Sequence, residues 1–482
     1  MVNEAYCGYK RLMKKNNYLN SPACRAEIEK MRTILAQDQQ MLNYDRGQIK
    51  CLQEQRLREI LTFAKNNSSW HKQRLADFDV DNFRLDDLAK LPTMDKADLM
   101  AHWNEIVTDP NLNYIAASKF LMAQTDFSLF RGFHLFASGG SSGRRGLFVW
   151  APDELAMMMA HSFRYQYRDG LTSSQERMMV AAIAAIKPVH LSQPIYAAPV
   201  LAEMQSVALS ALAPIEQLVE SLNYYQPTHL NGYPSVLARL ALQALQGNLN
   251  IKPVRILVGS EPLLPNMLEV IHRAWSTVLV TNVWGSTDAG IHAASCDYSQ
   301  GNLHLNEDSV IIEAVDHDNR PVVAGERATK ILITNLLRKS MPVFRYEMDD
   351  AVMPLNENCA CGSHFKLVRA IEGRYEEDFF YANNIIVIPE VFENVIMQEA
   401  GIDEYQVFQT ADGAEISIVP EKNATVNIDI MQSNLLLQLT ELGLNNPIVT
   451  INCVEKLKRH LDTGKLKRFH AFKHVGQPLI LS

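Results

Sequence analysis

The sequence predicts an α/β protein with a large N-terminal domain of helices and mixed or parallel sheets, followed by a small α+β domain. The first observation is that apolar, strand-like runs alternate with amphipathic helical runs from about residue 176 onward. The second is a change of character near residues 372–377, after which the last 100 or so residues have apolar strands and helical runs of their own. We therefore expect two domains, residues 1–372 and residues 373–482.

The elements are predicted in order along the chain. Apolar residues recur near a helical spacing through the first 100 or so residues, which we expect to be helical. Pro234 and Pro265 stand near the starts of two later helical runs, where the missing amide hydrogen costs nothing. Residues 254–290 form a strand–loop–helix–strand–loop pattern. Ligands of open α/β sheets bind beyond the carboxyl ends of the strands, so residues 259–262 and 284–290 are predicted binding loops.

Composition excludes several classes of protein. The 482 residues are 47% hydrophobic and 21% charged, which is typical of a globular chain. The formal charge of −8 gives no electrostatic attraction to nucleic acid or to an anionic membrane, so neither is expected as a partner. Seven cysteines are too few for a secreted disulfide framework. No apolar run approaches the roughly 20 residues that span a bilayer, and no secretory signal is visible, so a cytoplasmic protein is expected.

A glycine-rich segment, SGGSSGRRG at residues 138–146, follows the apolar run FHLFA. Glycines let backbone amides approach an anion closely, and the hydroxyls and arginines add hydrogen-bond donors. The GK[ST] ending of a P-loop is absent. Taken by itself, the segment is as typical of a surface loop as of a phosphate site.

Further motifs follow this segment along the chain. They are GYPS at 232–235, GSEP at 259–262, WGSTDAG at 284–290, RYEMDD at 345–350, GR at 373–374 and TGK at 463–465. The succession resembles the adenylate-forming (ANL) superfamily, most closely its phenylacetate–CoA ligase-like branch, from about Gln53 to Phe469. The resemblance implies that a carboxylic acid, aromatic or similarly small, reacts with ATP to give an acyl-adenylate. The acyl group then passes to a nucleophile, usually coenzyme A.

The resemblance also implies roles for individual residues. Lys465 would bridge the substrate carboxylate and the phosphate, and could enter and leave by rotation of a mobile C-terminal domain. Thr287 would lie near the α-phosphate, Asp288 would bind Mg²⁺, and Asp350 would accept from the ribose hydroxyls beside Arg374. The nucleotide would further contact the phosphate-loop residues Ser141, Ser142 and Gly143, the adenine-pocket residues Gly259, Ser260, Glu261, Pro262 and Trp284, and the neighbouring Gly285 and Ser286.

Some positions depart from the family pattern. Asp288 replaces the usual glutamate, and Glu376 or Glu377 replaces the hinge aspartate. The glycine near the pantetheine tunnel is missing, and Asn384 is expected to substitute for it because asparagine tolerates a left-handed backbone. These changes affect acyl transfer more than adenylation. The identity of the acyl acceptor is therefore predicted less firmly than the adenylation step. The alternatives to coenzyme A are an amine or the thiol of a carrier protein, and a non-catalytic nucleotide-binding relative is the rival from another class.

A second constellation combines Cys296, His304, Cys359 and Cys361. Three thiolates and one imidazole would complete a tetrahedral zinc site with no position open for water, which indicates a structural metal. Related ligases carry a similar arrangement. The alternative is a turn with free thiols, and His292 and His364 are alternative ligands.

The acid-binding pocket gives the weakest signal. His190 stands near the position where the superfamily has an aromatic gate, and Tyr233, Gly259 and Ser286 are the other candidates. The identity of the acid and the oligomeric state, including a homodimer, stay open.

Overall fold

The computed structural model describes residues 21–125, 127–138, 146–171, 178–184, 189–191, 205–369, 377–396, 399, 401–420, 424–459 and 466–472. The chain divides into two compact units. Unit 1 comprises residues 1–348 and 352–371, and unit 2 comprises residues 349–351 and 372–482.

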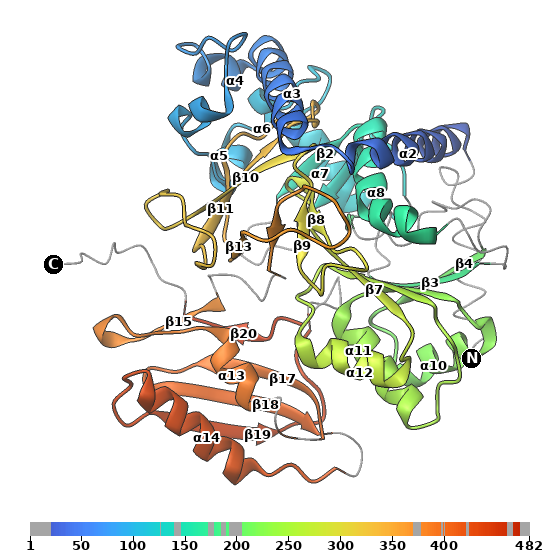
Figure 1. Cartoon of the computed structure of the whole chain (residues 1–482), viewed down its shortest axis with the longest axis vertical. Helices are drawn as coiled ribbons and strands as arrows, with labels where there is room; N and C mark the ends of the chain where they lie inside the picture. The colour runs from blue at the N-terminus through green and yellow to red at the C-terminus, as the bar shows by residue number, and fades with distance from the viewer. Residues whose placement is uncertain are drawn as a thin grey trace. The chain divides into compact units, whose positions relative to one another are not determined.

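Helices dominate the start of unit 1, as the apolar spacing predicts (Figure 1). The first long helix is capped by Ser21, and the second by a capping box between Asp45 and Gln48. The helices and helical turns of unit 1 are α2 (Pro22–Met41), α3 (Arg46–Asn67), α4 (Ser69–Arg74), η1 (Leu85–Lys90), α5 (Lys96–Ala101), α6 (Trp103–Ile106), α7 (Tyr114–Ala123), α8 (Pro152–Gln166), η2 (Tyr167–Leu171), α10 (Ile215–Tyr225), α11 (Pro234–Leu245) and α12 (Pro265–Ala274).

A nine-stranded mixed sheet forms the centre of unit 1, in the order β13-β14-β9-β8-β7-β6-β5-β3-β4. Strands β7, β6, β5, β3 and β4 pair in parallel, and β8, β9, β14 and β13 continue the sheet antiparallel. Their bounds are β3 (Met179–Ala184), β4 (Gln205–Ser210), β5 (His229–Gly232), β6 (Arg255–Gly259), β7 (Leu279–Ser286), β8 (Gly290–Ala294), β9 (Leu303–Leu305), β13 (Pro354–Leu355) and β14 (Leu367–Val368). The predicted strand–helix–strand unit is confirmed as β6–α12–β7, and Pro234 and Pro265 open their helices.

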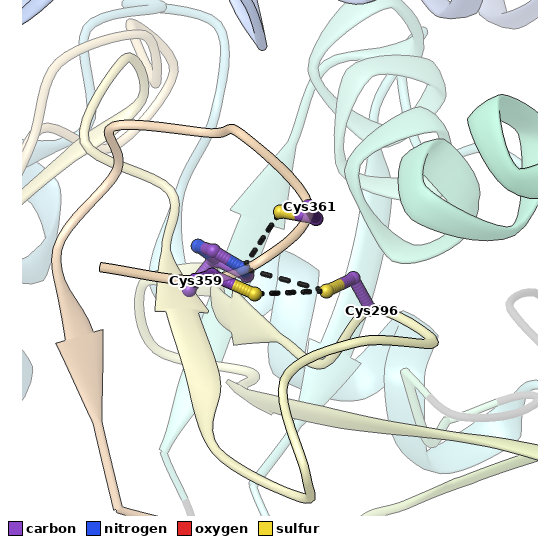
Figure 2. A group of neighbouring side chains, drawn as sticks. Cys296, Cys359 and Cys361 are labelled. Carbon is purple, nitrogen blue, oxygen red and sulfur yellow. Dashed lines mark hydrogen bonds between the residues drawn. The ribbon is translucent and has the colours of Figure 1, made fainter. Parts of the chain in front are cut away.

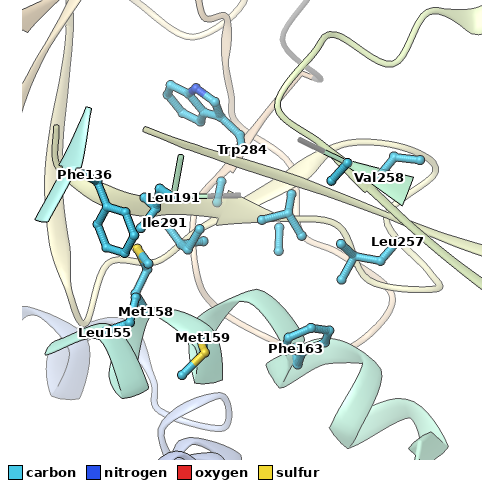
Figure 3. Packing of buried hydrophobic residues seen from close by; sticks show 14 of the residues in the cluster. Phe136, Leu155, Met158, Met159, Phe163, Leu191, Leu257, Val258, Trp284 and Ile291 are labelled. Carbon is cyan, nitrogen blue, oxygen red and sulfur yellow. The ribbon is translucent and has the colours of Figure 1, made fainter. Parts of the chain in front are cut away.

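Two smaller sheets complete unit 1. One is the hairpin of β1 (His134–Ala137) and β2 (Leu147–Trp150), and the other joins β10 (Val310–Val315), β11 (Lys330–Asn335) and β12 (Tyr346–Met348). The core lies where α8 packs against the large sheet. Met158 and Phe163 of α8 belong to the same buried cluster as Leu257 and Trp284 of the strands (Figure 3). Burial of these side chains holds the strand ends that carry the predicted binding loops.

Unit 2 has a core of its own around Phe379, Phe392, Leu435 and Phe469. Its four-stranded sheet has the order β19-β18-β17-β20, beside a short hairpin of β15 and β16 (Figure 1). Its elements are β15 (Phe379–Phe380), η4 (Ala382–Asn384), β16 (Ile386–Val387), α13 (Pro389–Ile396), β17 (Ile402–Gln409), β18 (Gly413–Pro420), α14 (Ile428–Glu441), β19 (Ile448–Cys453) and β20 (Phe469–His470). The predicted α/β fold with a large first and a small second part is confirmed.

Candidate nucleotide and metal sites

The loop between β7 and β8 carries Thr287 and Asp288, and side chains from distant elements hold its backbone. The indole Nε1 of Trp150 donates to the Thr287 carbonyl oxygen at 3.2 Å. Nη1 of Arg338 donates to the Asp288 carbonyl oxygen at 2.5 Å, and its Nε and Nη2 donate to the carbonyl oxygen of Val149. The Arg338 guanidinium lies 4.1 Å from the Trp150 ring centroid, so the two donors also hold each other in place.

Asn335 holds the next carbonyl of the same loop. Its Nδ2 donates to the Ala289 oxygen at 2.7 Å, and its Oδ1 accepts from the backbone amides of Leu337 and Arg338. Three successive carbonyls are thus bound by three side chains. Burial lowers the pKa of Arg338 to about 10, so its guanidinium stays protonated at neutral pH. The loop is therefore fixed before any ligand arrives.

The carboxylate of Asp288 is buried and is held at one of its two oxygens. The Tyr346 hydroxyl donates to Oδ2 at 2.7 Å, and Nζ of Lys96 lies 3.4 Å from the same oxygen. Burial, reinforced by the Asp288 charge, raises the pKa of Tyr346, so the phenol keeps its proton. Within the described chain, Oδ1 of Asp288 has no hydrogen-bond partner. A carboxylate held at one oxygen and open at the other suits a hard cation such as Mg²⁺.

Lys96 also connects Asp288 to the stem of the glycine-rich segment. Its ammonium contacts Oγ of Ser138 at 3.3 Å, and that hydroxyl accepts from the Gly146 amide at 3.0 Å. The Ser138 amide donates to the Gly146 carbonyl, which closes the β1–β2 hairpin. The segment between them, residues 139–145, lies outside the described residues.

Two further features fix the backbone and side chains near the ends of β6 and β7. Ser260 has a left-handed backbone with φ of +70°, a conformation unusual for serine. Beside the other loop, the buried His292 ring contacts Oγ of Ser286 at 3.1 Å and packs edge-on against Trp284. Burial lowers the pKa of His292 to about 3, so it is neutral at physiological pH.

The metal constellation assembles as predicted from the sequence. The ligand atoms of Cys296, His304, Cys359 and Cys361 all lie within 4.8 Å of one another. Figure 2 shows the side chains of the three cysteines gathered in one place. Sγ of Cys296 is 3.5 Å from Nε2 of His304 and 3.5 Å from Sγ of Cys359, and Sγ of Cys361 is 3.5 Å from the same imidazole nitrogen. Zinc bond lengths in a tetrahedron give ligand–ligand edges of about 3.5–3.8 Å. The cluster therefore has the size of a zinc site, and the sulfurs are too far apart for a disulfide.

The residues around this cluster orient its ligands. Nδ1 of His304 lies 3.3 Å from the Phe365 carbonyl, which turns Nε2 toward the thiols, and the Tyr165 ring stacks on the imidazole at 5.1 Å. Hydrogen bonds, chiefly from Cys296 and also from His304, lower the pKa of Cys361, whereas the hydrogen bond with Cys361 and burial raise the pKa of Cys296. The negative charge of the metal-free cluster therefore lies on Cys361. His292 lies against Ser286 instead, so His292 is excluded as the fourth ligand; His364 is likewise outside the group.

In unit 2, one buried side chain holds both ends of the segment that contains Lys465. Nε2 of Gln406 donates to the carbonyl oxygens of Lys458 and Lys467, at 2.9 and 2.8 Å. Its Oε1 accepts from the Lys458 amide at 3.2 Å. Gln406 is 2% exposed, so these bonds do not compete with water.

Comparison with known proteins supports this architecture. The chain is 21% identical over 390 residues to the phenylacetate–coenzyme A ligase of Thermus thermophilus, covering 77% of this chain and 82% of that enzyme. It is 21% identical over 314 residues to the protein CapK of Staphylococcus aureus, where the match spans 64% of this chain but only 63% of CapK. A crystal structure of 2-hydroxyisobutyryl-CoA ligase with an acyl-AMP superposes with a TM-score of 0.70 at 17% identity, over 90% of this chain and 91% of that one.

The chain has the fold of the adenylate-forming CoA ligases. The resemblance seen in the sequence is confirmed at this level. No protein-family model matches the sequence. In the described part of this adenylate-forming fold, no helix combines the length and apolarity needed to cross a bilayer.

Several predicted site residues lie on described elements of this fold. Gly259 ends β6, Trp284, Gly285 and Ser286 end β7, and Tyr233 caps α11 and is completely buried. His190 is also buried, and Asp350 groups with unit 2. Other predicted residues lie outside the described residues: Ser141, Ser142, Gly143, Arg374, Glu376 and Lys465.

One expectation is wrong. Asn383, with φ of +61°, takes the left-handed conformation that was expected of Asn384. Either asparagine tolerates this backbone, and the short turn η4 decides which one adopts it.

Sequence reasoning did not find Lys96, Trp150, Asn335, Arg338 or the role of Tyr346. Of these, only Tyr346 stood in a recognised motif, RYEMDD. The others act through contacts with residues far away in the sequence, and no local pattern marks them.

Proposed function

We propose that this chain is an ATP- and Mg²⁺-dependent acid–CoA ligase that activates a small carboxylic acid, aromatic or similar in size, as an acyl-adenylate. The observation that carries the proposal is the fixed loop of Thr287 and Asp288 at the carboxyl end of β7, with the Asp288 carboxylate held ready at one oxygen. The likeness to phenylacetate–coenzyme A ligase supports the same reading. A reaction that uses ATP and coenzyme A would suit the cytoplasmic location expected from the sequence.

The residues suit the charge problem of this chemistry. A carboxylate attacks a phosphate, so negative charge accumulates and must be balanced by cations and hydrogen-bond donors. Asp288 would hold Mg²⁺, which supplies Lewis-acid stabilisation of the phosphates when bound. Thr287 would donate to the α-phosphate, Asp350 would accept from the ribose with Arg374 beside it, and Lys465 would bring a positive charge to the reacting oxygens. The first and second units would correspond to the adenylation domain and the lysine-bearing domain.

The cysteine cluster fits a structural zinc ion. Four protein ligands at tetrahedral spacing leave no open position for a substrate, so we assign the cluster a stabilising role. It ties the β8–β9 loop to the turn at Cys359–Cys361, two segments that β9 and β14 also bring together in the large sheet.

Exchange of labelled pyrophosphate into ATP tests the adenylation. Purified protein would be offered aryl, arylacetic and aliphatic acids with Mg²⁺, and exchange should depend on one class of acid. Absence of exchange across the whole panel would leave the non-catalytic nucleotide-binding relative as the better reading.

The acceptor needs a separate test. With the active acid, coenzyme A should give a free thioester detectable by mass spectrometry. Adenylate that accumulates with coenzyme A but disappears with an amine or a phosphopantetheinyl carrier protein would favour those acceptors. The missing glycine of the pantetheine region is the observation that motivates these alternative acceptors.

A further inference from the structure

Lys96 links the Asp288 carboxylate to the base of the glycine-rich segment. It is the first residue of α5, and its ammonium lies between Oγ of Ser138 and Oδ2 of Asp288, at 3.3 and 3.4 Å. The Lys96 side chain is 26% exposed, so it is accessible to solvent while it contacts the buried carboxylate. A compact ammonium with three donors can hold two partners and still offer one to an anion.

The contacts of Asp288 and Ser138 would allow the Lys96 ammonium to move from the carboxylate to another anion. Asp288 keeps the Tyr346 hydrogen bond on the same oxygen, so the carboxylate stays oriented if the lysine moves away. Ser138 lies at the stem of the β1–β2 hairpin, so a lysine that leaves Asp288 remains at the strand end of that hairpin. The four-carbon stem of lysine permits such a shift at little cost.

We propose that Lys96 is an exchangeable counter-cation: it neutralises Asp288 in the free protein and binds the polyphosphate of the nucleotide when a divalent cation takes over Asp288. The inference rests on the proposed function, because it takes the nucleotide to be ATP. It assigns Lys96 a direct contact with substrate. The lysine at Oδ2 and a metal ion at the open Oδ1 would compete for the single negative charge of one carboxylate.

This arrangement predicts opposite effects of one substitution. Lys96→Met keeps the aliphatic stem but removes the charge. Mn²⁺, used as a probe for Mg²⁺, should bind the free variant about tenfold more tightly, since the competing cation is gone, and tenfold corresponds to about 1.4 kcal/mol. Mg²⁺-ATP should bind about tenfold more weakly, whereas AMP, which lacks the β- and γ-phosphates, should change less than about twofold.

The measurements are Mn²⁺ binding by electron paramagnetic resonance and nucleotide binding by calorimetry, on the full chain and without any acid. Lys96→Arg keeps the charge and should restore most of the ATP affinity. Lys90→Met is the matched control, because Lys90 is an exposed lysine on the nearby η1 that pairs with Asp87. Thermal unfolding of each variant verifies that it is folded.

The outcomes separate the two proposals. If wild-type protein binds neither ATP nor AMP, the proposed function fails. If wild-type protein binds both, and Lys96→Met changes ATP and AMP affinity equally or leaves Mn²⁺ affinity unchanged, the counter-cation role is overturned while the nucleotide site stands.

Discussion

Arg338 donates a hydrogen bond of 2.5 Å to the carbonyl oxygen of Asp288, although 50 positions separate them in the sequence. Burial of a guanidinium carries a desolvation free-energy penalty, which its hydrogen bonds to backbone carbonyls must offset. The backbone position of the Asp288 loop therefore depends on a side chain from a different part of the fold.

Arg338→Met should weaken Mg²⁺-ATP binding about tenfold and lower the free energy of unfolding by about 2–4 kcal/mol, because buried carbonyl oxygens lose their donors. Calorimetry and urea denaturation give the two values. Arg320→Met is the control: its side chain is largely exposed, and its loss should cost less than about 0.5 kcal/mol. Unchanged ATP affinity in a folded Arg338→Met protein would show that the loop holds its position without this residue.

Lys465→Ala should reduce acyl-adenylate formation by at least about 100-fold, because the positive charge proposed to act at the reacting oxygens would be lost. Transfer from a chemically prepared acyl-adenylate to coenzyme A should stay largely intact. The measurement compares pyrophosphate exchange with thioester formation in the same preparation. Lys456→Ala, at an exposed position on the same unit, serves as the control. Equal loss of both half-reactions would refute a role of Lys465 confined to adenylation.

Gln406→Glu should lower adenylation about tenfold with a smaller effect on acyl transfer. The substitution replaces the donating amide with an oxygen that faces the carbonyls of Lys458 and Lys467, so the two ends of the Lys465 segment lose their common anchor. The matched control is Gln409→Glu on the same strand, since Gln409 binds Phe380 and Phe472 instead. If the ratio of adenylation rate to acyl-transfer rate is similar in the two variants, Gln406 only stabilises the domain and has no specific role in adenylation.

Under the proposed zinc assignment, Cys361→Ser should abolish zinc binding and lower the free energy of unfolding by about 3 kcal/mol or more, because metal binding contributes directly to folding. Elemental analysis should fall from about one zinc per chain to about none. Cys453→Ser, at an exposed thiol, should change neither value. Wild-type protein purified without added metal and found free of zinc, with no uptake on titration, would contradict the assignment.

Asp38→Asn should stabilise the protein more at pH 8 than at pH 5. Asp38 is completely buried, and burial raises its pKa from 3.8 to about 7, although the Arg164 and Arg56 charges oppose the shift and Asp308 adds to it. The unfolded chain loses this proton near pH 4 and the folded chain near pH 7. The free energy of unfolding therefore falls as pH rises through this window.

The neighbours of Asp38 keep their charge states over the same range. Burial lowers the pKa of His161 to about 3, so His161 is neutral, and the Arg164 charge keeps the pKa of Asp308 below its usual value. Urea denaturation at pH 5, 6, 7 and 8 should show the advantage of Asp38→Asn growing by about 2–3 kcal/mol. A constant difference across these values would mean that Asp38 ionises in the folded protein as it does in the unfolded chain.

The local parts of this fold follow from the sequence. Apolar runs, the helix-opening positions of Pro234 and Pro265, and the spacing of β6, α12 and β7 are decided by neighbours a few residues away. The metal cluster of Cys296, His304, Cys359 and Cys361 can also be predicted from the sequence, because cysteine and histidine are rare enough for such a grouping to stand out. The exchange of roles between Asn383 and Asn384 was beyond reach, since both tolerate a left-handed backbone.

The amino-acid sequence was enough to predict the succession of strands and helices along the chain, the loops at the strand ends, and the kinds of side chain available for phosphate and metal. Tertiary structure alone decided that Lys96, Tyr346 and Arg338 meet at Asp288, since 192, 58 and 50 residues of spacing can be closed only by packing the sheet, the hairpin and α5 around one core. Hydrogen bonds and ion pairs act over a few ångströms, whereas sequence patterns report on neighbours along the chain.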